Sequence, residues 1–230
     1  MTQGGVPTTK AGTGRTIGKA ALERLLVESA PETGEPASTL YLRPGEGQEF
    51  LESLGVTGQD WRERLTKLND SILDSGTGLA VLRSGDQCLV VAPPFPLPES
   101  LFFSSWDFST LLLLLKSEFT LGVVLLRLGR SSVAVYRGER LISSKTDARY
   151  VKGRHHAGVT SQLRFQRIRE GQMKLMYEKT CEAVHSQFTS IAGDLDYMFL
   201  GGERFTLNGF LKICTYMERF RSITLGRRLN

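Results

Sequence analysis

The sequence predicts an α/β fold, or an α+β fold, with a mixed sheet and a small α/β extension before it. Three observations lead to this prediction. Short apolar runs around glycine-containing turns indicate strands and hairpins, whereas apolar residues spaced by three and four indicate helices. The chain also ends in a predicted strand, helix and strand, which is the order of a βαβ unit.

The N-terminal third divides into a flexible segment and a small α/β extension. Residues 1–38 are predicted to be a tail and linker, rich in Gly and Thr at first and in Pro and Glu later, around one short helix at 19–29. Residues 39–74 form the extension. Its predicted elements are a strand at 39–44 that ends at Pro44, a helix at 47–54 and a helix at 58–74 with Trp61, Leu65, Leu68 and Ile72 at helical spacing.

Residues 75–230 are predicted to form the principal domain. A long helix is its most regular element, and its inward positions are predicted to be Phe165, Ile168, Leu175, Met176, Val184 and Phe188. The other predicted elements are strands at 78–82, 88–92, 120–128, 132–136, 139–144, 195–200 and 222–225, and helices at 106–117, 161–188 and 206–219.

Composition excludes some classes of protein. The 230 residues are 40% hydrophobic and 23% charged, which is too apolar for a wholly disordered chain. Charged residues interrupt the apolar stretch 101–128, so no membrane span is predicted. The three cysteines lie far apart without a CxxC pair. We therefore expect no disulfide framework, no thiolate zinc site and a cytoplasmic location.

Positive charge is concentrated in one segment, 145–174. It holds eight basic residues and two acidic ones, while the whole chain carries a net charge of +5. A solvated charged face would explain the run, but its position beside a loop and a helix start favours phosphate binding. The residues are Lys145, Arg149, Lys152, Arg154, Arg164, Arg167, Arg169 and Lys174, with Asp147, Glu170 and the pair His155-His156.

Gln162 lies where this loop meets the helix. A glutamine amide does not ionise near neutrality and is a poor general base, but it can orient a water and donate to a developing oxyanion. Hydrolysis at this position would therefore work by positioning, with further groups supplied by a partner. His155 and His156 project differently and have no nearby Cys or carboxylate set, so no metal site is predicted.

The run GVTSQLRFQRIREGQMKLMYEKTCEAV resembles the middle, catalytic domain of archaeal and eukaryotic class I release factors. Leu163-Arg164-Phe165, Arg167 and Arg169 match that family's motif without gaps, and the resemblance covers about residues 75–230. The loop tip, Gly-x-x-Ser-Gln-x-Arg-Phe, looks more like the release-factor-like domain of ribosome-rescue peptidyl-tRNA hydrolases (the Vms1/ANKZF group) and its bacterial relatives. Val159 stands where glycine is usual in that branch.

The resemblance implies a ribonuclease-H-like α/β fold with a catalytic loop at 145–162. It implies a ribosome-associated peptidyl-tRNA hydrolase that frees nascent chains on stalled large subunits, with no cofactor and no protein-bound metal. Its partners would be ribosomal RNA and peptidyl-tRNA, not DNA or membranes. The residues carried over as catalytic are Gly158, Ser161 and Gln162. Those expected at RNA are Arg149, Lys152, Arg154, His155, His156, Arg164, Arg167, Arg169 and Lys174.

Two alternatives follow from other residues. Val159 in the loop favours a non-catalytic ribosome- or RNA-binding module of the same fold. A metal-dependent nuclease would need clustered carboxylates, for which Asp194 and Asp196 are the candidates. No segment resembles the stop-codon motifs of release factors, so decoding of stop codons is not expected.

Overall fold

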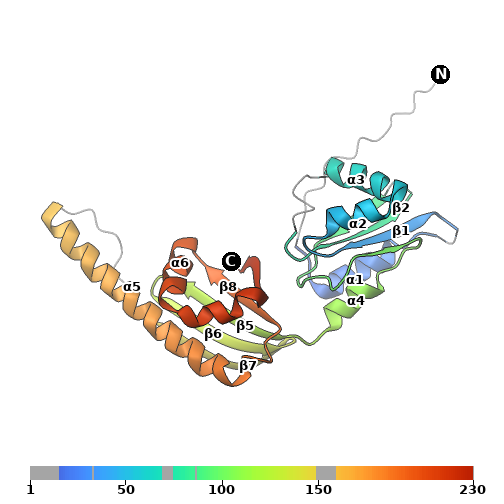
Figure 1. The fold of residues 1–230 in the computed structure, drawn as a ribbon. Helices are drawn as coiled ribbons and strands as arrows, with labels where there is room; N and C mark the ends of the chain where they lie inside the picture. The colour runs from blue at the N-terminus through green and yellow to red at the C-terminus, as the bar shows by residue number, and fades with distance from the viewer. Residues whose placement is uncertain (1–15, 33, 69–74, 86, 149–158, 230) are drawn as a thin grey trace. The chain divides into compact units, whose positions relative to one another are not determined.

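The computed structural model describes residues 16–32, 34–68, 75–85, 87–148 and 159–229. The chain divides into two compact units, Met1–Lys116 and Ser117–Asn230. Each unit contains its own sheet. The mixed α/β class predicted from the sequence is therefore confirmed, with one sheet in each unit (Figure 1).

The first unit contains a four-stranded antiparallel sheet. Its strands stand in the order β3-β2-β1-β4, so the first strand of the chain lies inside the sheet. The strands are β1 (Ala37–Leu42), β2 (Leu79–Ser84), β3 (Gln87–Val91) and β4 (Leu101–Phe103).

Helices cover both faces of this sheet (Figure 1). On one face, α2 and α3 pack through Leu51, Trp61 and Leu65 onto apolar residues of β1 and β2. On the other, the buried Tyr41 hydroxyl donates to the Asp107 carbonyl just before α4, and the Trp106 indole donates to the Leu26 carbonyl of α1. The helices are α1 (Lys19–Glu28), α2 (Gly47–Ser53), α3 (Val56–Leu68) and α4 (Ser109–Lys116).

The division between the units differs from the boundary expected before residue 75. β2 pairs with β1 along its whole length, from Ala37 opposite Ser84 to Leu42 opposite Leu79. This pairing draws residues 75–116 into the first unit and enlarges the extension predicted at 39–74. The short strand β4 was not predicted, because its three residues follow a proline-rich segment and show no alternation of their own.

The second unit contains a mixed five-stranded sheet in the order β7-β6-β5-β8-β9. β5 runs parallel to β8, and β8 runs parallel to β9, while β5, β6 and β7 form an antiparallel meander. The strands are β5 (Thr120–Arg127), β6 (Arg130–Arg137), β7 (Arg140–Ala148), β8 (Tyr197–Gly202) and β9 (Thr224–Leu229).

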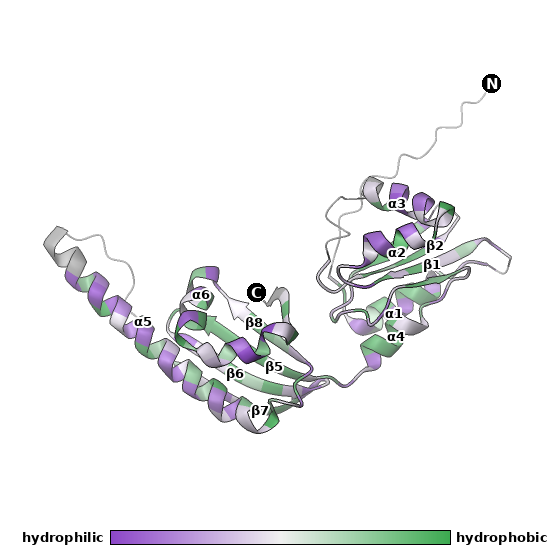
Figure 2. Ribbon diagram, in the orientation of Figure 1, coloured by the Kyte–Doolittle hydropathy of each residue, from purple (hydrophilic) through white to green (hydrophobic). Residues whose placement is uncertain are grey.

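One apolar cluster joins this sheet to its helices. Val124, Val133 and Met198 from the strands meet Val184 and Phe188 of the long helix α5. Figure 2 shows the strands β5 and β6 mostly hydrophobic, whereas hydrophilic residues recur along α5. The remaining segments are α5 (Val159–Phe188), η2 (Thr189–Ile191), α6 (Arg204–Ile213) and η3 (Thr215–Ile223). The long helix after the predicted loop is therefore confirmed, and the predicted helix at 206–219 is divided between α6 and η3.

The expected catalytic loop at 145–162 is shorter in the structure. β7 continues to Ala148, and α5 already begins at Val159. Residues 145–148 belong to the sheet because they pair with β6, with Lys145 opposite Val133 and Ala148 opposite Arg130.

A disulfide joins α5 to the residue that follows α6. Cys181 and Cys214 are bonded, with 5.4 Å between their Cα atoms. The expectation of no disulfide was therefore wrong. The two cysteines are 33 residues apart in the sequence, and only the packing of α5 against α6 brings them together.

No helix within the described residues is both long enough and apolar enough to span a membrane.

Candidate functional site

The N-terminal part of α5 extends past the end of the sheet (Figure 1). We name residues 159–172 the arm; as a helix they span about 21 Å. Among residues 164–172, whose side chains the structure describes, none is buried, and Met173 is the first buried side chain that follows them. A helix that buries so few side chains can contact a partner along most of its surface.

Positive side chains gather on one side of α5, along the arm and just after it. Arg164, Arg167 and Lys174 are exposed and follow one another at spacings of three and seven, which places them on one face of the helix. Lys174 lies 3.8 Å from the carboxylate of Glu178. Within the described part of the chain, neither Arg164 nor Arg167 has an ion pair, so both guanidinium groups can bind phosphate.

Two apolar residues of α5 that were predicted to face inward are exposed. Ile168 is 41% exposed and Leu175 is 44% exposed, so this part of the prediction was wrong. They share a face of α5, but that face lies on the side of the helix opposite to the buried Tyr177 and therefore points away from the core. They form an apolar strip beside the arginines of the arm.

The base of the arm is held firmly. Met173, Met176 and Tyr177 are buried in the core cluster, and the disulfide at Cys181 follows one turn later. Burial raises the pKa of Tyr177, and the nearby carboxylate of Glu203 acts in the same direction. The arm is thus a helical extension of a rigid, covalently fixed segment.

The predicted catalytic residues are placed only in part. Ser161 and Gln162 lie in the first turn of α5, at the far end of the arm from the core. Gly158 and the predicted RNA contacts Arg149, Lys152, Arg154, His155 and His156 lie outside the described residues. The structure therefore places Gln162 on the same helix as Arg164 and Arg167.

Comparison with known proteins bears on this same segment. Residues 119–218 match the model of a family described as the Actinobacteria/chloroflexi VLRF1 release factor. The matched residues run from the start of β5 into η3 and include the arm. Residues 119–218 therefore resemble a release-factor domain. The resemblance to release factors drawn from the sequence is thereby confirmed.

Two solved structures are similar to the chain. An archaeal translation termination factor, aRF1, shares 19% identity with it, at 90% coverage of this chain, 64% coverage of that chain and a TM-score of 0.36. A second archaeal protein shares 17% identity with the chain, at 93% coverage of this chain, 66% coverage of that chain and a TM-score of 0.34. The chain thus spans less than two thirds of either protein's length. No curated protein matches the sequence.

Arg169 of the release-factor-like domain differs from the other arm arginines. It lies four residues before the buried Met173 and therefore on the core-facing side of α5. Its Nε atom is buried and has no hydrogen-bond partner among the described residues. This position separates Arg169 from the exposed pair Arg164 and Arg167.

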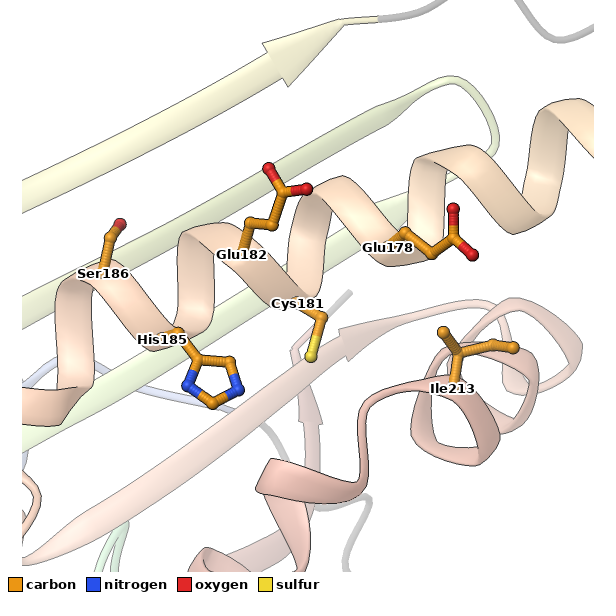
Figure 3. A pocket seen from close by; sticks show the side chains of 6 residues that line it. All are labelled: Glu178, Cys181, Glu182, His185, Ser186 and Ile213. Atoms are coloured by element: carbon orange, nitrogen blue, oxygen red, sulfur yellow. The ribbon is translucent and has the colours of Figure 1, made fainter.

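A shallow pocket lies lower on α5, next to the end of α6 (Figure 3). Its polar side chains already have partners within the domain. The Glu182 carboxylate accepts a hydrogen bond from Lys179 at 2.6 Å, and the His185 ring stacks against Tyr216 at 3.9 Å. The pocket is lined by Glu178, Cys181, Glu182, His185, Ser186 and Ile213. It offers no convergent acid, base and nucleophile for chemistry.

Asp194 and Asp196, the candidates for a nuclease site, do not form one. The Asp196 carboxylate accepts a hydrogen bond from the Thr120 amide at 2.7 Å, which ties the start of β8 to the start of β5. Among the residues that the structure describes, no three His, Cys, Asp or Glu side chains gather as a metal site would require.

Proposed function

We propose that this protein is a ribosome-associated peptidyl-tRNA hydrolase that frees nascent chains from tRNA on stalled large ribosomal subunits. The family match across residues 119–218 supports the proposal most directly, because it includes the arm. The exposed arginines of the arm and Gln162 in its first turn supply the groups that such a reaction needs.

The proposed reaction is the hydrolysis of an ester. A water oxygen attacks the carbonyl carbon that joins the peptide to the terminal ribose of the tRNA, and the bond from that carbon to the ribose oxygen breaks. The products are a peptide carboxylic acid and a free ribose hydroxyl, which takes up the proton released by the water. Gln162 would orient the water or donate to the oxyanion, with Gly158 and Ser161 shaping the loop beside it.

The arm would bring this glutamine to the ester. Arg164, Arg167 and Lys174 would bind phosphates of ribosomal RNA or tRNA along the same helix. We assign the same role to Arg149, Lys152, Arg154, His155 and His156 before the arm. The proposed reaction uses no cofactor, and its partners place the protein in the cytoplasm.

One observation favours a second function, that of a non-catalytic ribosome- or RNA-binding module. Val159 is the first residue of α5, where the related branch has a glycine. A β-branched residue at this position gives up the backbone freedom that glycine would supply. The arm would then only dock the protein.

Release of labelled peptide from peptidyl-tRNA on isolated large subunits tests the proposal. The Gln162→Ala variant should lose about 10²- to 10³-fold in release rate, as expected when one oxyanion donor or water-orienting group is removed. Gln166→Ala is the matched control. It removes the next glutamine of the same helix, an exposed residue that bonds to Glu170 at 2.8 Å, and it should change the rate less than twofold.

The two functions predict different results. Full release by the Gln162→Ala variant would contradict the role of this residue. Co-sedimentation with large subunits that weakens with salt, without any release by the unaltered protein, would instead establish the binding module.

A further inference from the structure

At one end of the sheet of the second unit, the strands β5, β7 and β8 end and β6 begins. The hairpin between β5 and β6 closes there, with Arg127 opposite Arg130. β7 ends beside it, since Ala148 pairs with Arg130, and β8 ends there because Gly202 pairs with Leu126. Residues that follow β8 are therefore brought to the arginine pair of the β5–β6 hairpin.

Gly202 fixes the approach of β8 to this hairpin. Its φ angle is +136°, which side chains other than glycine rarely adopt, and a Cβ atom there would collide with the Leu126 carbonyl. The chain can therefore turn tightly against β5 and begin α6 at Arg204, two residues later. We name Arg127, Arg130, Arg204 and Phe205 the arginine edge.

The arginines of the arginine edge have no charged partner among the described residues. All three arginines are exposed, and within the described residues none of them takes part in an ion pair or a side-chain hydrogen bond. Two carboxylates at this end of the sheet have other partners: Glu203 accepts a hydrogen bond from the Thr206 hydroxyl at 3.3 Å, and Asp147 also has a partner. Asp147 pairs with Ser131, so it faces the side of the sheet opposite to Arg130.

An exposed aromatic side chain follows Arg204 at the start of α6. Phe205 is 67% exposed in the first turn of α6, although the next two residues of that helix, Thr206 and Leu207, are buried. Phe205 therefore has no role in the core. Exposed aromatic rings beside arginines provide stacking for unpaired bases together with binding of phosphates.

We infer that the arginine edge is a second RNA-binding surface, separate from the arm, that holds the phosphates of an RNA strand and stacks a base on Phe205. This inference rests on the proposed ribosomal function for its partner. An acidic polypeptide would also attract the arginines, but it would give the exposed ring no base to stack on. RNA accounts for both features.

A matched pair of variants tests the inference. Arg127→Ala/Arg130→Ala removes the hairpin pair of the arginine edge. Arg137→Ala/Arg140→Ala removes the equivalent pair from the β6–β7 hairpin at the opposite end of the same sheet. Both double variants remove two exposed charges from the strand pair that flanks a two-residue turn, so differences in net charge and in hairpin stability largely cancel.

Binding is measured with purified large subunits and with a synthetic stem-loop RNA, at several salt concentrations. The Arg127/Arg130 variant should bind both about tenfold more weakly than the unaltered protein at low salt. The slope of log affinity against log salt should also fall by one to two. Phe205→Ala should weaken binding of the stem-loop but leave the slope unchanged.

Equal losses in the two arginine variants would overturn the inference, because net charge alone would then explain them. Poly-glutamate binding that is lost in the Arg127/Arg130 variant, with RNA binding retained, would assign the edge to acidic polypeptides instead. Peptide release separates the two proposals. Absence of release by the unaltered protein would contradict the proposed hydrolase activity. The difference in RNA binding between the two arginine variants would still test whether the arginine edge binds RNA.

Discussion

Tyr177 of α5 and Gly209 of α6 are in such close contact that a Cβ atom on Gly209 would lie 2.7 Å from the Tyr177 hydroxyl oxygen. This contact lies at the base of the arm, where α5 enters the core. It allows the two helices to approach each other closely next to the Cys181–Cys214 disulfide.

Gly209→Ala should therefore destabilise the second unit by about 1–3 kcal/mol, because the added methyl group overpacks a buried ring. Urea unfolding followed by far-UV circular dichroism measures the change. Gly171→Ala is the matched control: it lies in α5 with nothing within 4 Å of the added carbon. It should stabilise the protein by up to about 1 kcal/mol through helix propensity. A loss of stability in both variants would contradict the packing argument.

Tyr177→Phe should leave stability unchanged or raise it by about 1 kcal/mol. The hydroxyl is buried and has no hydrogen-bond partner within the described residues, so its removal ends a desolvation penalty. The same change should also rescue part of the loss in Gly209→Ala, which a double-mutant cycle measures. A loss above 1 kcal/mol in the single variant would show that the hydroxyl bonds to a group outside the described residues.

The sequence predicted most elements of the second unit because their signals are local. The β5–β6 hairpin, for example, alternates on both sides of Leu128-Gly129. Ile168 and Leu175 were misplaced because their spacing shows that they share a helix face, but not that this face lies opposite to the buried Tyr177. Cys181 and Cys214 meet only through tertiary packing, which no spacing rule reveals.

The candidate site was predictable to the extent that it depends on sequence order. Arg164, Arg167 and Gln162 follow one another on one helix, so their proximity could be inferred. The arginine edge was missed because Arg127 and Arg204 are distant in sequence, and the register of β5 and β8 brings their strand ends together. The signal that could have found it is the repeated pattern of arginines around short turns, at 127–130 and 137–140.

Reduction of the Cys181–Cys214 disulfide should lower the stability of the second unit by about 3 kcal/mol, since the bond closes a loop of 33 residues. Far-UV circular dichroism in urea with and without dithiothreitol measures this. The chain has two tryptophans, Trp61 and Trp106, and both lie in the first unit. Tryptophan fluorescence therefore reports the unfolding of the first unit, and its urea transition should be the same with and without dithiothreitol. The exposed Cys88 provides the control, because Cys88→Ser should leave the response to reductant unchanged.

Tyr41 should make the first unit sensitive to alkaline pH. Burial raises its pKa to about 12 from an ordinary value of 10.0, so the folded state holds the phenolic proton more tightly than the unfolded state does. Stability is therefore retained below pH 10 and lost as the pH rises toward 12, by about 2–3 kcal/mol. Urea unfolding followed by tryptophan fluorescence at several pH values measures the loss.

Tyr41→Phe provides the comparison for that experiment. It should lower stability by about 1 kcal/mol at neutral pH, because the hydrogen bond from the hydroxyl to the Asp107 carbonyl is lost. Between pH 10 and 12, the Tyr41→Phe variant should lose less stability than the unaltered protein does. Parallel pH curves for the two proteins would show that another group controls the alkaline transition.

The exposed arginines of the arm should govern salt-dependent binding to large subunits without affecting stability. Arg164→Ala/Arg167→Ala should lower the slope of log affinity against log salt by one to two, while the urea midpoint stays constant, since neither side chain is buried. Lys212→Ala/Arg221→Ala removes two exposed cations elsewhere in the second unit and should change the slope by less than half as much. Equal slopes for the two variants would mean that the arm acts only through net charge. A lowered urea midpoint in the Arg164/Arg167 variant would mean that these arginines stabilise the helix.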